Sequence, residues 1–299
     1  MSEPLTLTLS KGDLTLAVAP SIGGAIAGFW RNGLALMRET PEQALRDGLV
    51  RLTSSYPLIP YSNRIAQGRF SFEETDHRLA LNFGDHPHSI HGNAWQKPWT
   101  IADATDARCC LVLQHHPLGD EMGWPFAYRA EQHFELDAEG LTLTLVLKNE
   151  DQRAMPAGLG LHPFFPKRPG IRLQFAAEGV YLNGEDSLPT ESVPVPDDWN
   201  YRAMRDLGEP RVDNCFKGWS GTAQILFGPE KIALRLQADP LFGHLVVYVP
   251  AGRDFFAVEP VSHMNNAINR PDIADHGLRV LLPGERLTAK VRFQVESLP

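Results

Sequence analysis

Apolar and polar residues alternate along much of the chain, and a period of two residues is typical of β-strands with one buried face. Residues 5–9 and 14–18 alternate on either side of the turn at residues 11–13 and predict a hairpin. A second hairpin is predicted over residues 132–147, with its turn at residues 137–140. The chain is therefore expected to be built mainly from antiparallel strands.

Further strands and few helices complete the predicted pattern. The additional strands are predicted at residues 171–175, 224–227, 232–237, 244–249, 255–258 and 288–295. One short helix is predicted at residues 41–46, and residues 184–198, rich in Pro, Ser and acids, predict a long surface loop. Strands continue on both sides of that loop, so we expect residues 1–299 to form a single all-β domain, either a sandwich or a barrel.

Composition and charge narrow the function classes. Of the 299 residues, 43% are hydrophobic and 21% are charged, which is enough to build a sizeable core. The 25 glycines and 24 prolines agree with many turns. The formal net charge of −8 argues against nucleic acid or an anionic membrane as partner, because both select clustered positive charge.

The cysteines and the N-terminus bear on localisation. Cys109, Cys110 and Cys215 are odd in number and two are adjacent, so a disulfide framework is not expected. A reducing compartment, and hence a cytoplasmic protein, is the simpler prediction. The first residues lack a basic start followed by an apolar stretch, so no signal peptide is expected, and no apolar run approaches the roughly 18 residues of a membrane span.

Histidines stand out among the residues that could carry chemistry. Motifs for nucleotides, zincin metals and serine hydrolases are absent. His86, His88 and His91 lie within six residues and suggest a metal site, acid/base or hydrogen-bonding groups, or ordinary loop residues. No acidic residue follows His88 closely, as a metal site on a β-scaffold would require. His162 lies in an apolar stretch and is either a satisfied core residue or a proton donor in a partly dry cleft.

Three charged residues each allow two interpretations. Arg64 lies between apolar neighbours and is either part of a structural ion pair or a ligand contact. Asp213, with Phe216 and Trp219 close behind it, is either part of a turn or a sugar-binding carboxylate beside an aromatic platform. Glu259 ends an apolar run, where it is either desolvated or projects into a cleft, and desolvation would raise its pKa and strengthen it as a base.

In this order the segments resemble the aldose 1-epimerase (galactose mutarotase) family. The matching motifs are N-R-I-x-x-G-x-F at residues 63–70, H-G at 91–92, a variant of G-x-x-H-P-Y/F-F at 158–165, D-x-x-F at 213–216 and E-x₆-N/D-A at 259–267. Residues 120–125 are similar to the family's acidic loop. No single motif is decisive, but five in the right order are specific.

The resemblance implies a fold and a reaction. The fold is a large antiparallel β-sandwich, the supersandwich of galactose mutarotase, and the reaction interconverts the α and β anomers of a free aldose without a cofactor. The implied catalytic residues are Glu259 as base and His162, with a pKa near neutrality, as acid. The implied substrate-binding residues are Asn63, Arg64, His91 and Asp213, with His91 near the ring oxygen.

Departures from the family pattern leave the sugar open. Asn93, Pro260-Val261 and residues 263–266 differ from common family residues beside the predicted site. An epimerase of hexose 6-phosphates is a second hypothesis, and it would need extra cations, for which Lys97, Arg168, Lys217 and Arg270 are the candidates. A non-catalytic sugar-binding protein is a third hypothesis. A metal-dependent, cupin-like isomerase that uses the histidines at 86, 88 and 91 is a fourth.

Overall fold

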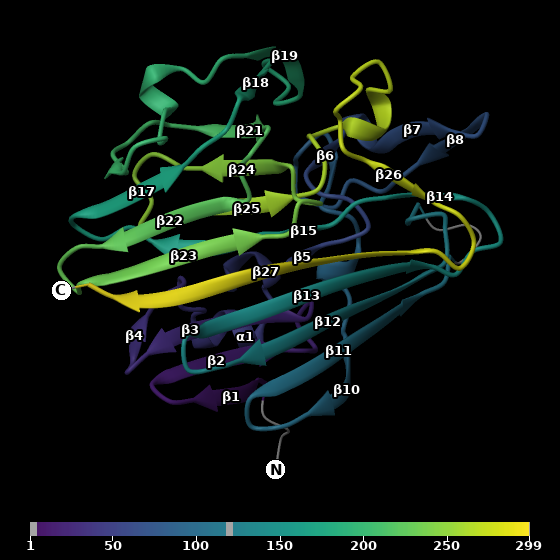
Figure 1. Ribbon diagram of the computed structural model, residues 1–299. Helices are drawn as coiled ribbons and strands as arrows, with labels where there is room; N and C mark the ends of the chain where they lie inside the picture. The colour runs from purple at the N-terminus through teal and green to yellow at the C-terminus, as the bar shows by residue number, and fades with distance from the viewer. Residues whose placement is uncertain (1–4, 118–121, 299) are drawn as a thin grey trace.

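Antiparallel β-sheets make up most of the computed structural model, which describes residues 5–117 and 122–298 (Figure 1). A nine-stranded sheet packs against an eight-stranded sheet at one end and a four-stranded sheet at the other, and side chains of all three share one core. The predicted all-β, antiparallel sandwich is therefore confirmed. Residues 120 and 121 of the predicted acidic loop lie outside the described residues.

The nine-stranded sheet contains the longest strands. Its order is β10 (Thr100–Ala104), β11 (Arg108–His115), β12 (Tyr128–Leu136), β13 (Gly140–Asn149), β27 (Arg286–Ser297), β23 (Ile232–Ala238), β22 (Thr222–Phe227), β17 (Ile171–Phe175) and β20 (Arg205–Asp206). The predicted hairpin at residues 132–147 is confirmed as β12 and β13, and Asp137 Oδ1 accepts the backbone N–H groups of Glu139 and Gly140 in its turn.

The eight-stranded sheet contains the strands that carry Asp213 and Glu259. Its order is β19 (Pro189–Val193), β18 (Gly179–Asn183), β21 (Asp213–Lys217), β24 (His244–Tyr248), β25 (Phe255–Val261), β15 (Gly160–Leu161) and β5 (Pro57–Leu58), with β16 (Phe164–Pro166) also paired to β25. The predicted loop at residues 184–198 is partly wrong. Residues 189–193 form an edge strand against β18, and the turn η4 (Asp197–Trp199) follows.

The smaller elements fill the ends of the sandwich. The four-stranded sheet contains β1 (Leu7–Lys11), β2 (Leu14–Ala19), β3 (Ala25–Arg31) and β4 (Leu34–Ala35), so the first predicted hairpin is confirmed with a shift of its first strand. Two-stranded pairs are β6 (Arg64–Ile65) with β9 (Ser89–Ile90), β7 (Arg69–Phe72) with β8 (Thr75–Arg78), and β14 (Met155–Ala157) with β26 (Arg279–Leu281). The helical segments are α1 (Glu42–Arg46), as predicted, and the turns η1 (Val50–Leu52), η2 (Ala66–Gly68), η3 (Ala94–Gln96) and η5 (Ala267–Asn269).

Strand β25 is buried on both faces. Phe256 and Val258 point into the core shared by the large sheets, whereas Ala257, Glu259 and Val261 point to the opposite face, which the segments around β5, η3 and β16 cover. A strand covered on both faces has an almost continuous apolar sequence. The prediction that the strand stops at residue 258 is therefore wrong, because β25 runs on to Val261 and Glu259 is an interior residue opposite Val246.

The cysteines at positions 109, 110 and 215 are free thiols, as expected from their number and spacing. Cys109 and Cys215 are buried, and Cys110 is partly exposed. In the described part of the chain, no helix is long and apolar enough to cross a membrane.

The core of the nine-stranded sheet predicts a stability difference between neighbouring residues of β13. Leu143 is fully buried and Thr144 faces outward. We expect Leu143→Ala to lower the free energy of unfolding by about 2 to 5 kcal/mol, because it leaves a cavity in a close-packed layer. Thr144→Ala, the matched control, should change it by less than about 1 kcal/mol. Urea unfolding followed by tryptophan fluorescence measures both, and equal effects would contradict this placement of the core.

Candidate active site

A cavity of about 350 Å³ opens on the face of β25 that points away from the main core. Its size lies within the range of small-molecule sites. All six residues that the sequence singled out as catalytic or substrate-binding line it: Asn63, Arg64, His91, His162, Asp213 and Glu259. Distant parts of the chain supply them, so the cavity exists only in the folded protein.

Glu259 and His162 are in contact at the floor of this cavity. Glu259 comes from β25 and is 2% exposed, and His162, between β15 and β16, is 7% exposed. The His162 Nε2 atom lies 3.4 Å from Glu259 Oε1. The backbone N–H of His162 donates to the carbonyl oxygen of Tyr56, which holds the main chain at His162. Within the described residues, Glu259 Oε2 and His162 Nδ1 are buried and have no hydrogen-bond partner, which is uncommon for buried polar atoms.

Burial raises the pKa of Glu259 and lowers the pKa of His162. Desolvation, and after it the Asp213 carboxylate, raises the pKa of Glu259 well above its ordinary value, while Arg64 opposes this rise. Desolvation, and after it Arg38, lowers the pKa of His162. The raised pKa of Glu259 agrees with the sequence analysis, but the near-neutral imidazole expected for His162 does not. Because the groups touch, their protonation is a property of the pair.

His91 is held in one orientation by Asn63. The His91 Nδ1 atom accepts the backbone N–H of Asn63 at 3.0 Å, and the backbone N–H of His91 donates to the Asn63 carbonyl oxygen at 2.9 Å. Burial, and after it His162, lowers the pKa of His91 well below its ordinary value, so the ring is neutral at pH 7. A neutral ring that accepts at Nδ1 carries its hydrogen on Nε2. The hydrogen that His91 can donate is therefore on Nε2.

Left-handed backbone produces this loop geometry. Asn63 and His91 have φ values of 56° and 67°, and Gly92 follows with 69°. A Cβ atom at Gly92 would lie 2.1 Å from the Ile59 carbonyl oxygen, so only glycine fits there. Strained backbone of this kind is common in functional sites because the surrounding structure must hold it.

Arg64 and Asp213 form an ion pair that also lines the cavity. The Arg64 Nη2 atom lies 3.0 Å from Asp213 Oδ2, and Nη1 donates to Asn63 Oδ1 at 2.9 Å. The Arg64 side chain is 11% exposed, whereas that of Asp213 is 43% exposed. The ion pair considered in the sequence analysis therefore exists, and it lines the cavity as well. Asp213 keeps carboxylate surface open to a ligand.

The segment after β25 supports Arg64 from behind. The backbone N–H of Asn266 donates to the Arg64 carbonyl oxygen, and Asn266 Oδ1 accepts the N–H of Ala66. The Nε2 atom of His263 accepts the N–H of Ser62. These residues depart from the family pattern, and their contacts hold the backbone on either side of Arg64 without lining the cavity.

The three neighbouring histidines do not converge on one point. His86 and His91 line the cavity, but the ring of His88 contacts the Gln67 N–H and the Asp186 carbonyl oxygen instead. In the described part of the chain, the one group with metal-ligand spacing is Cys110, Glu131 and His133 on the nine-stranded sheet, where Glu131 already pairs with Arg129. The hypothesis of a cupin-like site built from the three histidines is therefore wrong.

The aromatic surface of the cavity differs from the one predicted. Phe216 and Trp219, expected beside Asp213 as a platform, are buried in the main core because they lie on the other face of the sheet or beyond it. The rings that line the cavity are Tyr56, Phe83, Phe164, Tyr248 and Phe255. Their segments carry no motif that points to a ligand, so these rings were not predicted from the sequence.

Three arginines in the cavity wall were also missed. Arg38, Arg51 and Arg253 line it together with Arg64. None of the four cations proposed from the sequence for a phosphate group does so, and that assignment is wrong. Lys97 lines another cavity, and the other three contact carboxylates elsewhere: Arg168 with Glu230, Lys217 with Asp275 and Arg270 with Asp272.

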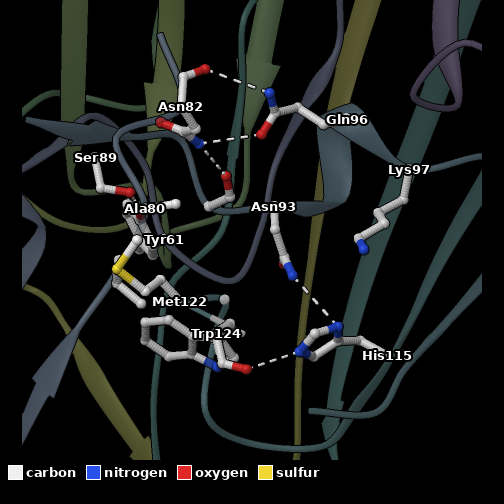
Figure 2. Close-up of a pocket in the computed structure, with 13 residues that line it drawn as sticks. Tyr61, Ala80, Asn82, Ser89, Asn93, Gln96, Lys97, His115, Met122 and Trp124 are labelled. Carbon is white, nitrogen blue, oxygen red and sulfur yellow. Dashed lines mark hydrogen bonds between the residues drawn. The ribbon is translucent and has the colours of Figure 1, made fainter. Parts of the chain in front are cut away.

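Figure 2 shows a second cavity, which is lined in part by Gly92 and Asn93 and has a volume of about 480 Å³. Its amide groups are largely bonded to one another or to His115: Asn82 contacts Gln96, and Asn93 contacts His115. Its described lining contains no carboxylate, so the acid/base pair belongs to the first cavity. The side chain of Asn93, which departs from the family pattern, also accepts a hydrogen bond from the Tyr128 hydroxyl. It therefore belongs to this second cavity and not to the candidate site.

The chain belongs to the aldose 1-epimerase family, whose model matches residues 5–294. It is 33% identical over 299 residues to the uncharacterized protein YphB of Escherichia coli K12, covering 97% of this chain and 99% of that protein. It is 26% identical to the uncharacterized protein YihR of the same organism, covering 88% of this chain and 86% of that one.

Solved structures agree with this assignment. A putative aldose 1-epimerase from E. coli K12 has a TM-score of 0.89 at 32% identity, covering 98% of this chain and 99% of that one. A galactose mutarotase-like protein from Clostridium acetobutylicum has a TM-score of 0.87 at 17% identity, covering 98% and 95%, and supports the fold alone. The supersandwich expected from the sequence is thereby confirmed.

The fixed orientation of His91 predicts its tautomer. In ¹⁵N-resolved NMR spectra at pH 7, the ring should show a protonated Nε2 and an unprotonated Nδ1, because the Asn63 N–H occupies Nδ1. The resonances are assigned by their loss in His91→Ala. A ring protonated on Nδ1 would contradict the bond to Asn63.

Proposed function

We propose that this protein is an aldose 1-epimerase that interconverts the α and β anomers of a free sugar by opening and reclosing the ring. The observation that carries the proposal is the buried contact of 3.4 Å between Glu259 and His162 in a cavity that also presents Arg64 and Asp213. A paired acid and base with unused polar atoms suits a reaction that consists only of proton transfers.

The proposed reaction balances without any further reactant. The Glu259 carboxylate takes the proton of the C1 hydroxyl, the bond between C1 and the ring oxygen breaks, and the His162 imidazolium protonates that oxygen. The aldehyde then turns about the bond between C1 and C2. Reclosure on the other face returns one proton to His162 and, through Glu259, the other to the oxygen on C1. Both residues end in their starting states.

The remaining residues hold the ring during these steps. His91 donates through Nε2 near the ring oxygen, where it stabilises the negative charge that develops as the bond breaks. Arg64 and the exposed oxygen of Asp213 bind hydroxyl groups, and Asn63 orients Arg64 through its side-chain oxygen. Tyr56 and Phe164 offer apolar surface to the C–H groups of the sugar.

The proton shared by Glu259 and His162 decides which state is active. Burial alone favours the carboxylic acid and the neutral imidazole. The catalytic form has the same total charge, with the proton moved to His162; Arg64 stabilises its carboxylate, while the larger effect of Asp213 opposes it. The pair therefore works with one proton in total, and the free site needs none from solvent when a sugar enters.

Glu259→Gln tests the base. The amide keeps the shape of the carboxylate but is not basic, so kcat should fall by about 10² to 10⁴ while sugar binding is largely kept. Anomer exchange by NMR, corrected for spontaneous mutarotation, measures the rate, and a titration of line widths measures binding. Glu135→Gln, at an exposed position of β12, is the control. Wild-type rates in Glu259→Gln would sink the assignment, and binding without turnover in the wild type would indicate a non-catalytic sugar-binding protein.

The shared proton predicts a bell-shaped dependence of kcat/KM on pH. At low pH a second proton reaches the pair and the base is lost, whereas at high pH the single proton leaves and the acid is lost. In His162→Asn the residual activity should rise once, as Glu259 ionises, and then stay level. NMR exchange rates from about pH 5 to about pH 9 give both profiles. A falling high-pH limb in His162→Asn would assign that limb to another group.

A further inference from the structure

The candidate site carries more positive charge than a neutral sugar requires. Four arginines line it, at positions 38, 51, 64 and 253, against the carboxyl groups of Asp213 and Glu259. Of these arginines, only Arg64 forms an ion pair with either carboxyl group among the described residues. The chain as a whole has a net charge of −8, so the cationic cavity is a local inversion. Such a cavity attracts anions and raises their association rate.

Arg38 is held by hydrogen bonds to backbone carbonyl groups and forms no ion pair with any described carboxylate. Its Nη2 donates to the carbonyl oxygens of Arg51, at 2.9 Å, and Thr53, while its Nε is buried and unpartnered in the described part of the chain. The guanidinium lies 3.8 Å from the Phe164 ring centre. Burial lowers the pKa of Arg38 to about 10, although Tyr56 and Asp254 oppose this. A desolvated cation without an ion pair costs free energy that an anionic ligand would offset.

Arg51 lies beside Arg38 and is more exposed. Its guanidinium is 4.8 Å from the Phe83 ring centre. The contact from the Arg38 side chain to the Arg51 carbonyl oxygen ties the two residues together at one end of the cavity. Two guanidinium groups, one held and one free to adjust, suit a tetrahedral or carboxylate anion because each offers a planar fork of N–H donors.

The position of these arginines relative to the two active-site histidines identifies a sugar carbon. The Phe164 ring under Arg38 stacks on His162 with 4.3 Å between centres, and the Phe83 ring under Arg51 meets His91 edge-on at 6.1 Å. Both arginines therefore lie one aromatic ring beyond the histidines that, in the proposed function, face the ring oxygen. In a pyranose, the carbon next to the ring oxygen and opposite C1 is C5, which carries C6.

We infer that the substrate is an aldopyranose with an anionic group on C6, bound by Arg38 and Arg51. This inference rests on the proposed function, because the orientation of the ring comes from Glu259 at C1 and His162 at the ring oxygen. Arg253, which also lines the cavity, adds to the positive potential. A phosphate, a sulfate or a carboxylate at C6 shares the required chemistry.

The test compares one neutral sugar with three anionic relatives. Anomer exchange by NMR is measured for glucose, glucose 6-phosphate, glucose 6-sulfate and glucuronate at low salt. We expect kcat/KM for at least one anion to exceed that for glucose by about tenfold or more, with the difference shrinking as salt is added. The best anion distinguishes a dianion, a tetrahedral monoanion and a planar carboxylate.

A variant then connects the preference to the arginines. Arg51→Gln, at an exposed position that should not disturb folding, should lower kcat/KM for the best anion by about tenfold more than for glucose. Arg108→Gln, an exposed arginine of β11, is the matched control and should leave the ratio unchanged. Arg38→Lys keeps the charge but loses the fork, and should weaken the anion preference in the same direction.

Each outcome separates the inference from the proposed function. If glucose exchanges its anomers as fast as the anionic sugars or faster, the inferred anionic substrate is overturned, but the proposed epimerase reaction stands. If no sugar exchanges its anomers faster than it does spontaneously, the proposed reaction is overturned. Sugar binding measured by calorimetry then tests the anion subsite by itself. Tighter binding of glucose 6-phosphate than of glucose, lost in Arg51→Gln, would still support the anion subsite, and equal binding would overturn it.

Discussion

The site depends on a carboxyl group buried in a strand that is covered on both faces. Phe256 and Val258 pack into the core between the large sheets, so the side chain of Glu259 lies on the opposite face of β25. Desolvation there makes ionisation of Glu259 costly, and the contact with His162 offers a place for its proton. The two groups lie 3.4 Å apart, and one buried polar atom of each has no hydrogen-bond partner among the described residues.

Loops with left-handed backbone residues supply the part of the site that the sheet does not. Asn63, His91 and Asn266 all have left-handed backbone, and their hydrogen bonds connect three distant segments around Arg64. Gly92 allows the His91 loop to approach Ile59 closely. These conformations cost free energy, which the packing of the surrounding sheets offsets.

Charge divides the cavity into two parts. Around Glu259, Asp213 and Arg64 the charges are paired, which suits groups that must exchange protons and bind hydroxyls. Around Arg38 the positive charge has no ion-pair partner among the described residues and stacks on aromatic rings, which agrees with the inferred binding of an anionic group. The second cavity behind the His91 loop has neither feature in its described lining.

The fold class, and the six candidate residues that meet in one cavity, could be predicted from the sequence, because alternation is local and the motifs of the aldose 1-epimerase family are short. The sequence did not predict side-chain positions that depend on packing against distant segments of the chain. Phe216 belongs to the core because its strand presents that side inward, and Glu259 looked like a strand end because both faces of β25 are covered. Arg38 and Arg51 carry no motif, and only the folded chain brings them into one cavity with Glu259. The physical reason is that burial and charge neutralisation are properties of the packed molecule, and no local pattern records which distant side chains will meet.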